Sequence, residues 1–172
     1  PAEMKARIID GELYVKSDAV MVGYYGDAEE TEKVLTDGWY ATGDLCRMDE
    51  EGFFYLTGRR KNLIILANGE NISPEEIERK LLYEYDDISD VIVCAEGDLI
   101  TAQVYPGYPD GCTMKEKAKM QERIREEIGQ YNESEPVYRQ IMKICFPEGT
   151  AGKTSSGKLL RRRNQEEQKD EH

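Results

Sequence analysis

Asp44 and Arg59 are the two residues whose types and positions point most directly to binding of a small polar ligand. Asp44 follows Thr42 and Gly43 at the end of an expected strand. One carboxylate there has enough lone pairs to accept hydrogen bonds from both hydroxyls of a ribose. The guanidinium of Arg59 could pair with a phosphate or hold the same sugar. Taken one at a time, a turn aspartate and a surface arginine are the alternative interpretations.

Lys158 is a second candidate, in the loop GKTSSGKL of residues 152–159. The loop has the spacing of the phosphate-binding pattern G-x-x-x-x-G-K and follows an expected strand. Leu159 stands where that pattern needs a Ser or Thr for magnesium, which argues against a true P-loop. A loop with one functional lysine fits better, because an ammonium can neutralise charge that develops on a carboxylate oxygen and a phosphate together. A solvated tail is the alternative.

The single histidine and the scattered cysteines argue against several kinds of site. His172 is the only histidine and stands last in the sequence, which disfavours a histidine base or a histidine-rich metal site. The four cysteines are far apart and include no Cys-x-x-Cys pair, so we predict neither a zinc site nor a disulfide framework. We therefore expect no metal in this chain and a reducing, cytoplasmic environment.

The charge balance disfavours a polyanionic partner. The net charge is -12, and 34% of the residues are charged. Such a chain is repelled by nucleic acid and by anionic membrane surfaces. The run of arginines at 161–163 is followed by acidic residues and reads as a mixed tail. No apolar run has membrane-spanning length, and no secretory leader is visible, so we expect no transmembrane segment.

The residues up to Leu56 have the pattern of an antiparallel sheet with one short helix. Asp-Gly pairs at 10–11 and 37–38 predict hairpin turns. Asp27 is expected to cap a helix that runs to Leu35. Strands are expected over 45–48 and 53–56. Four aromatic residues are expected to pack in this part of the chain: Tyr24, Tyr25, Trp39 and Tyr40.

Strands and helices alternate in the rest of the chain. The stretch 57–78, TGRRKNLIILANGENISPEEIE, predicts a strand, a tight Asn-Gly turn, a strand and a helix that begins at Pro74. Two strands, an amphipathic helix from Met114 to about Gly129 and a last strand over 141–146 follow. The inner face of that helix is expected to carry Met114, Ala118, Ile124 and Ile128. The expected fold class is α+β, with a β-rich segment at 1–58 and a small α+β domain at 59–172.

Five segments in order resemble the C-terminal portion of the adenylate-forming (AMP-binding) superfamily, which includes acyl-CoA synthetases, luciferases and peptide-synthetase adenylation domains. Together they nearly fill the chain, and their order and intervals make the resemblance specific. The segments are GELYV at 11–15 with GYY at 23–25 and EET at 29–31, DGWYATGDL at 37–45, GRRK at 58–61, SPEEIE at 73–78 and KTSSGKLLR at 153–161.

The resemblance implies roles for particular residues. Asp44 would hold the ribose hydroxyls of ATP and of the acyl-adenylate, and Arg59 would contact the ribose or a phosphate. Lys61 would be the hinge of a mobile C-terminal domain. Lys158 would assist attack of a carboxylate on the α-phosphate. The turn of Asn68, Gly69 and Glu70 would face the pantetheine thiol, since a bare backbone lets a thin arm pass closely.

The resemblance also implies substrates and partners. The stretch 63–78 is most similar to long-chain fatty acyl-CoA synthetases, although many relatives carry a lysine near Ile65 that is absent here. ATP with Mg²⁺ and CoA would serve the full-length enzyme, with nothing bound to this portion alone. The partner would be a large N-terminal domain, without which this portion would be inactive and would expose apolar surface. The alternatives are a ligase that loads a carrier protein and a non-catalytic α+β interaction module.

Overall fold

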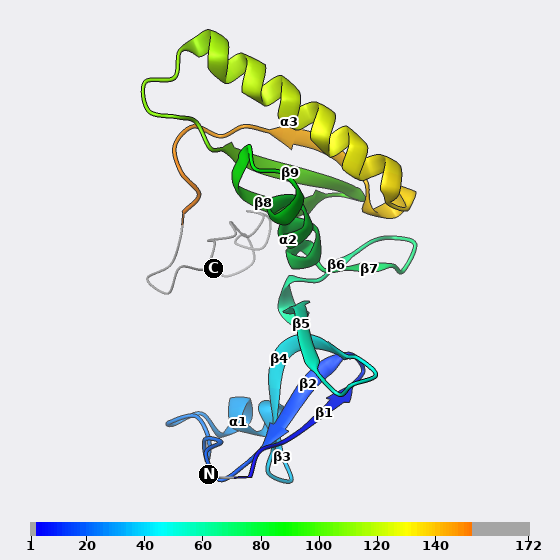
Figure 1. Cartoon of the computed structure of the whole chain (residues 1–172). Helices are drawn as coiled ribbons and strands as arrows, with labels where there is room; N and C mark the ends of the chain where they lie inside the picture. The colour runs from blue at the N-terminus through cyan, green and yellow to red at the C-terminus, as the bar shows by residue number, and fades with distance from the viewer. Residues whose placement is uncertain (1–2, 153–172) are drawn as a thin grey trace, which may run out of the picture. The chain divides into compact units, whose positions relative to one another are not determined.

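The computed structural model describes residues 3–152 of the chain (Figure 1). These residues contain sheets and helices in the α+β arrangement that the sequence predicts. They fall into two compact units. The first unit comprises the described residues up to Ile65 together with Asn71–Glu76, and the second comprises Leu66–Glu70 together with the described residues from Ile77 onward.

The first unit is built on a five-stranded antiparallel sheet with the order β1-β2-β4-β3, in which β5 also pairs with β4. A short 3-10 helix, η1, and the two-stranded pair β6–β7 follow it. The elements are β1 Lys5–Ile9, β2 Glu12–Lys16, α1 Ala28–Val34, β3 Leu35–Thr36, β4 Trp39–Met48, β5 Phe54–Arg59, η1 Arg60–Asn62, β6 Ile64–Ile65 and β7 Asn71–Ile72.

Local sequence signals account for the turns and caps of this unit. Asp10 and Gly11 both have positive φ (49° and 77°), as a two-residue hairpin turn between β1 and β2 requires. The second Asp-Gly pair, at 37–38, turns the chain from β3 into β4 in the same way. The Asp27 carboxylate accepts a hydrogen bond from the amide of Glu30 at 2.9 Å, so it caps α1 as predicted.

Little of the first unit is buried. Between residues 3 and 65 only Glu12 and Cys46 are fully buried. Tyr25 is fully exposed, so the prediction that it packs within this chain is wrong: its loop places the ring in solvent. Several large apolar side chains are also exposed on the hairpin of β4 and β5: Met48, Phe53, Phe54, Tyr55 and Leu56.

Gly58 allows a close approach between β5 and the start of α2 (Pro74–Glu84). The Ser73 hydroxyl, just before the helix, donates a hydrogen bond to the carbonyl of Thr57 at 2.9 Å. A Cβ added to Gly58 would lie 2.2 Å from Ser73 Oγ and 2.8 Å from Glu75 Oε2. Only glycine fits at position 58 without a clash, so packing explains the glycine that opens the segment GRRK.

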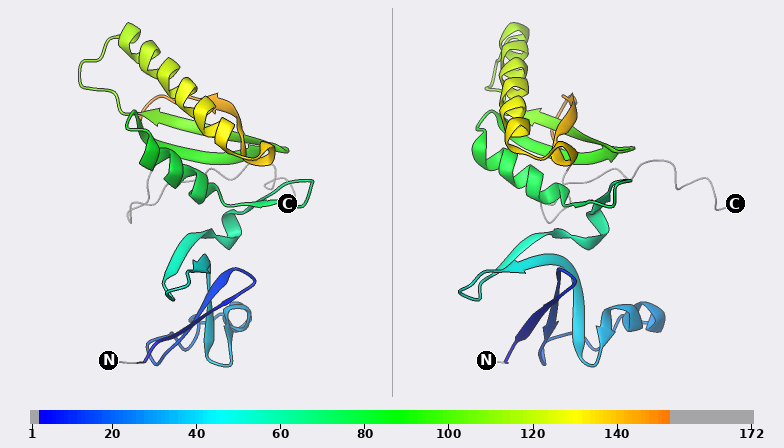
Figure 2. Two further views of the ribbon diagram at one scale, coloured as in Figure 1. Left: turned by 45° about the vertical axis from the view of Figure 1, so that its right-hand side comes forward. Right: turned by 90° about the vertical axis from the view of Figure 1, so that its right-hand side faces the viewer.

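The second unit holds a dry core between one sheet and two helices. The sheet has the order β10-β9-β8, with β8 and β9 antiparallel and β10 parallel to β9. Helices α2 and α3 lie on one side of it (Figure 2). Its remaining elements are β8 Ile88–Glu96, β9 Leu99–Pro106, α3 Met114–Ser134, the 3-10 helix η2 Val137–Arg139 and β10 Ile141–Cys145. Fully buried core side chains include Ile77, Leu81, Val91, Val93, Ala102, Val104 and Ile124.

Polar side chains bind the backbone of both outer strands of this sheet. The buried carboxylate of Glu78, on α2, accepts a hydrogen bond from the amide of Val93 in β8 at 2.7 Å. The Asn132 amide, on α3, donates to the carbonyl of Ile141 at 2.9 Å and accepts from its N–H at 2.8 Å. Each helix is thus tied by a side chain to a backbone group of an outer strand.

The sequence-based prediction for α3 is wrong in part. Met114 and Ala118 are exposed, and the buried residues Ile124, Ile128 and Tyr131 lie at the middle of the helix or beyond it. The helix also continues past Gly129 to Ser134. A helical glycine costs only about 1 kcal/mol, and burial of Ile128 and Tyr131 on either side offsets that cost. Among residues 3–152, no helix has the length and apolar character to cross a bilayer.

Candidate functional site

Residues 42–44 form a bulge in β4. The strand pairing joins Glu12 to Leu45 and Tyr14 to Ala41, so β2 advances by two residues (14 − 12) while β4 advances by four (45 − 41). The bulge therefore adds two residues to β4. Bulges of this kind bend a strand and re-aim its side chains, and they occur often beside functional sites.

Side-chain hydrogen bonds hold the bulge in place. The Thr42 hydroxyl donates to the carbonyl of Leu13 at 2.8 Å, and the amide of Asp44 donates to that hydroxyl at 3.1 Å. Gly43 has φ +70°, in the left-handed region that favours glycine. Each residue of the sequence Thr-Gly-Asp thus suits the bulge. The threonine hydroxyl replaces a hydrogen bond of the strand ladder, the glycine adopts the positive φ, and the aspartate carboxylate follows directly after the turn.

Asp44 and Arg59, predicted from the sequence to act together, form an ion pair. Arg59 Nε lies 2.7 Å from Asp44 Oδ1, and Arg59 Nη1 donates to the carbonyl of Thr42 at 3.3 Å. The two residues face each other in the pairing of β4 with β5. Both side chains are partly accessible, at 24% and 39%. Because an ionised carboxylate has about four lone-pair sites, Asp44 retains capacity for further donors.

Glu12 is a buried member of this cluster that sequence reasoning did not single out. Its Oε1 accepts a hydrogen bond from the amide of Gly43 at 2.9 Å, and its Oε2 lies 2.5 Å from Arg60 Nη1. This hydrogen bond with Glu12 raises the pKa of Arg60 above its ordinary value. The two partners of Glu12 lie 31 and 48 positions further along the chain. The sequence therefore showed only a glutamate directly after an Asp-Gly turn, with no sign of its burial.

A pocket of about 420 Å³ lies beside this cluster, within the first unit. Arg59, Arg60 and Lys61 line it together with Thr42 and Gly43, and two aromatic residues, Tyr24 and Tyr40, also line it. A hydrogen bond between the Tyr40 and Tyr24 side chains, together with burial, raises the pKa of the Tyr40 hydroxyl. The site thus combines cationic side chains, phenols and a nearby carboxylate, the groups that a sugar phosphate needs.

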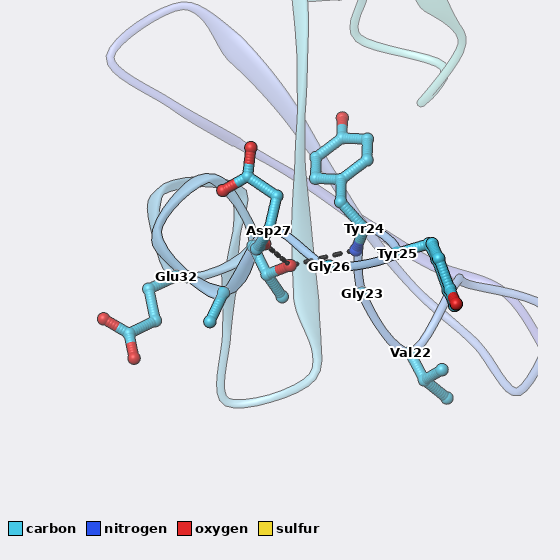
Figure 3. Close-up of a pocket in the computed structure, with 9 residues that line it drawn as sticks. Val22, Gly23, Tyr24, Tyr25, Gly26, Asp27 and Glu32 are labelled. Atoms are coloured by element: carbon cyan, nitrogen blue, oxygen red, sulfur yellow. Dashed lines mark hydrogen bonds between the residues drawn. The ribbon is translucent and has the colours of Figure 1, made fainter.

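The loop of residues 22–26 closes a second, more open depression against α1 (Figure 3). The Thr31 hydroxyl accepts a hydrogen bond from the amide of Tyr24 at 2.9 Å and donates to the carbonyl of Asp27 at 2.6 Å. A Cβ on Gly23 would lie 2.9 Å from Thr31 Cγ2, so glycine is needed for this approach. Thr31 therefore fixes the position of Tyr24, which lines both depressions.

Asn68, Gly69 and Glu70 form the tip of the β6–β7 hairpin. The Asn68 side chain accepts a hydrogen bond from the amide of Glu70 at 3.0 Å, and the amide of Gly69 donates to the carbonyl of Leu66 at 2.9 Å. Gly69 has φ +85°, and nothing lies within 4 Å of a Cβ placed on it. The tip is a tight turn, as the Asn-Gly pair of the sequence predicts.

The two lysines predicted from the resemblance differ in what the structure shows of them. Lys158 lies outside the described residues. Lys61 lies in η1 with an exposed side chain and lines the pocket beside Arg59 and Arg60. Within residues 3–152, no three His, Cys, Asp or Glu side chains gather in a way that could hold a metal ion.

Comparison with known proteins gives a family match over most of the chain. Residues 61–171 match the model of the AMP-binding enzyme C-terminal domain. The chain is 38% identical over 170 residues to a long-chain-fatty-acid–CoA ligase of Bacillus subtilis, covering 99% of this chain and 29% of that protein. It is 48% identical over 69 residues to a fatty acid–[acyl-carrier-protein] ligase of Mycobacterium marinum, covering 40% of this chain and 13% of that one.

A solved structure supports the same fold. The O-succinylbenzoate coenzyme A synthetase of Bacillus subtilis, solved in complex with ATP and a magnesium ion, is 28% identical to this chain, with a TM-score of 0.69. The match covers 93% of this chain and 33% of that one. The chain therefore spans about a third or less of the length of these proteins.

Proposed function

The chain belongs to the AMP-binding enzyme family, whose C-terminal domain it carries, and we propose that it serves an ATP-dependent ligase that joins a carboxylic acid to a thiol. The observation that carries the proposal is the Asp44–Arg59 pair, presented by the β4 bulge beside a pocket lined with cations. Such a pair offers a carboxylate for sugar hydroxyls and a guanidinium for a phosphate.

In the first half-reaction, a carboxylate oxygen of the acid would attack the α-phosphorus of ATP. An O–P bond to the acid forms and the bond to the leaving pyrophosphate breaks, which gives an acyl-adenylate. Asp44 would accept hydrogen bonds from the ribose hydroxyls, and Arg59 would contact the ribose or phosphate. Lys158 would neutralise charge between the attacking carboxylate and the phosphate. Positioning and charge neutralisation are what such a transfer chiefly needs.

In the second half-reaction, the thiol of CoA would attack the acyl carbon. A thioester forms, AMP leaves with the electron pair of the broken C–O bond, and the thiol proton passes to solvent. Lys61 would be the hinge at which the C-terminal domain turns between the two steps. The tip of Asn68, Gly69 and Glu70 would then lie along the pantetheine arm. The positive φ and open surroundings of Gly69 support a backbone that a thin substrate can approach closely.

The proposed acid is a fatty acid, supported by the likeness to the Bacillus ligase along 99% of this chain. The O-succinylbenzoate synthetase shares the fold but acts on a different acid, so the fold does not choose the acid. Mg²⁺ would accompany ATP.

The proposed partner of the first unit is a preceding large domain of the same polypeptide. The exposed apolar side chains of the β4–β5 hairpin support a covering surface. On this proposal the chain alone forms no acyl-adenylate.

The test uses the full-length enzyme and separates the half-reactions. Lys158→Ala should abolish pyrophosphate release on mixing ATP with a fatty acid, yet spare thioester formation from supplied acyl-adenylate. Lys143→Ala is the matched control, because Lys143 is an exposed lysine that pairs with Glu96 at 2.8 Å and has no role in the proposed mechanism. Equal loss of both half-reactions would contradict the role of Lys158.

The acceptor is tested separately. Acyl transfer to free CoA is compared with transfer to a phosphopantetheinylated carrier protein, the alternative favoured by the likeness to the Mycobacterium ligase. Preference for the carrier would replace CoA in the proposal. No adenylate formation with any acid would instead favour a non-catalytic interaction module.

A further inference from the structure

Glu12 combines burial with two partners from different segments. Its side chain is 5% exposed, and a carboxylate withdrawn from water is stable only when it is paired and hydrogen-bonded. Each oxygen has its own partner: the amide of Gly43 at 2.9 Å on Oε1 and Arg60 Nη1 at 2.5 Å on Oε2. The partners are the residue before Asp44 and the residue before Lys61.

We propose that Glu12 is a positioning residue, which holds the bulge that presents Asp44 and ties it to the turn that carries Lys61. This inference rests on the proposed function, because it assigns Asp44 to the nucleotide. Glu12 itself does not contact the substrate. It acts through the backbone of Gly43 on one side and through the guanidinium of Arg60 on the other.

The Gly43 contact sets the direction of Asp44. A bulge lacks the regular ladder bonds of a sheet, so its backbone groups need other partners. Thr42 supplies one such partner and Glu12 supplies the other. Without the Glu12 oxygen, the Gly43 amide loses its acceptor. The bulge can then relax and turn the Asp44 carboxylate away from the sugar hydroxyls, and small misplacements at a binding group are costly.

The Arg60 contact joins the bulge to η1. Arg60 is mostly exposed, at 64%, yet its guanidinium reaches a buried carboxylate. Arg59 makes a parallel connection one residue earlier, to Asp44 and to the carbonyl of Thr42. Two consecutive arginines therefore attach the segment before Lys61 to the same bulge, and Glu12 is the buried end of one attachment.

The experiment measures KM in the full-length enzyme for ATP, for supplied acyl-adenylate and for CoA. Glu12→Ala should raise KM for ATP and for acyl-adenylate about tenfold, the effect of losing a charge-assisted hydrogen bond. KM for CoA should stay within about twofold, since CoA needs no contact with Asp44. General damage to the fold would not separate the three constants in this way.

Two further variants complete the test. Arg60→Met should raise KM for ATP about threefold. Because the Arg60 side chain is mostly exposed, this variant should fold, and it tests the same contact if Glu12→Ala does not fold. The double variant Glu12→Gln with Arg60→Met should raise KM for ATP by less than the two single variants combined. The glutamine oxygen can still accept the hydrogen bond from the Gly43 amide, and no cation then faces the neutral side chain.

Glu78→Ala is the matched control, because Glu78 is a buried carboxylate that also accepts from a backbone amide, in the second unit. It should lower the thermal midpoint while KM for ATP stays within about twofold. Unchanged KM for ATP in both Glu12→Ala and Arg60→Met would overturn the inference alone. A wild-type enzyme that forms no acyl-adenylate would overturn the proposed function, and the inference with it.

Discussion

The two units of the chain bury their side chains very differently. In the second unit, the core residues of β8, β9, α2 and α3, among them Ile77, Val93 and Val104, are almost completely removed from water. In the first unit, up to Ile65, the buried residues are Glu12 and Cys46, and the large apolar side chains of the β4–β5 hairpin face solvent. The second unit therefore carries its own hydrophobic stabilisation, whereas the first is held mainly by its strand ladders and polar contacts.

The difference in burial matches the different structural needs of the two units under the proposed function. On the proposed function the second unit would turn as a body, and the core of α2, α3 and the β8–β10 sheet gives it the internal cohesion that such a motion would need. The first unit would present the proposed nucleotide site, and the bulge at 42–44 with Glu12, Arg59 and Arg60 gives it the fixed polar groups that such a site would need.

The largest expected effect is the loss of a core side chain in the second unit. Ile124 is fully buried, so Ile124→Ala should cost about 2–5 kcal/mol of unfolding free energy. Denaturant titration followed by circular dichroism measures this, because most helical residues of the described chain lie in α2 and α3. The single tryptophan, Trp39, lies in the first unit and reports separately on it by fluorescence.

The matched change in the first unit is Leu56→Ala. Its side chain is 52% exposed, so the expected loss is within about 0.5 kcal/mol. If Ile124→Ala shifted the Trp39 transition as far as the circular dichroism transition, the two units would unfold together. That result would contradict the conclusion that the second unit is stabilised by its own core.

The next effect in size is expected at the β8 edge. Glu78→Ala removes a charged acceptor of the Val93 amide and should cost about 1–3 kcal/mol. Amide hydrogen exchange at Val93 should accelerate, whereas exchange at Gly43, whose acceptor is Glu12, should stay unchanged. Glu78→Gln keeps an acceptor oxygen and should lose less. Faster exchange at Gly43 as well would show that the two units share their stability.

A smaller effect is expected at the helix caps. Thr113 forms a capping box with Glu116 at the start of α3, so Thr113→Ala should cost about 1 kcal/mol in the second unit's transition. Asp27→Ala removes the equivalent cap of α1, which has no buried residue. It should leave that transition in place and reduce only the helical signal. Equal shifts from both variants would contradict the difference in cohesion.

The smallest expected effect is a pH dependence centred on Glu127. Burial, followed by the nearby carboxylate of Asp87 and opposed by Arg123, raises the pKa of Glu127 above its ordinary 4.5. In the window between 4.5 and the raised pKa, the folded state binds more protons than the unfolded state. Stability of the second unit should therefore fall as pH rises through that window and level off above it. Glu127→Gln should flatten this slope, and an unchanged slope would assign it to another group.

Elements with local signals were predictable from the sequence. The Asp-Gly pairs supply residues that tolerate positive φ, Asp27 supplies a cap, and Pro74 after Ser73 starts α2, each through chemistry within a few residues. The pairing of Asp44 with Arg59 followed from their expected shared ligand, and the ladder between β4 and β5 brings them together.

Long-range packing was not predictable in the same way. Helical periodicity predicted that Met114 and Ala118 share a buried face with Ile124. It cannot show that burial begins only at Ile124, because that depends on which part of α3 packs against the rest of the unit. Glu12 alternates with Leu13 like any strand residue, and its burial depends on Gly43 and Arg60, far along the chain. A single sequence carries no signal for partners at such separations.

The hydrogen bonds made by Glu78 and Asn132 also bear on how the second unit meets other molecules. An exposed strand edge ordinarily invites another extended chain to add itself to the sheet, and that is a common start of aggregation. Here an added strand would have to displace a carboxylate from β8 or a side-chain amide from β10. The two side chains therefore hinder backbone pairing with another chain at Val93 and at Ile141.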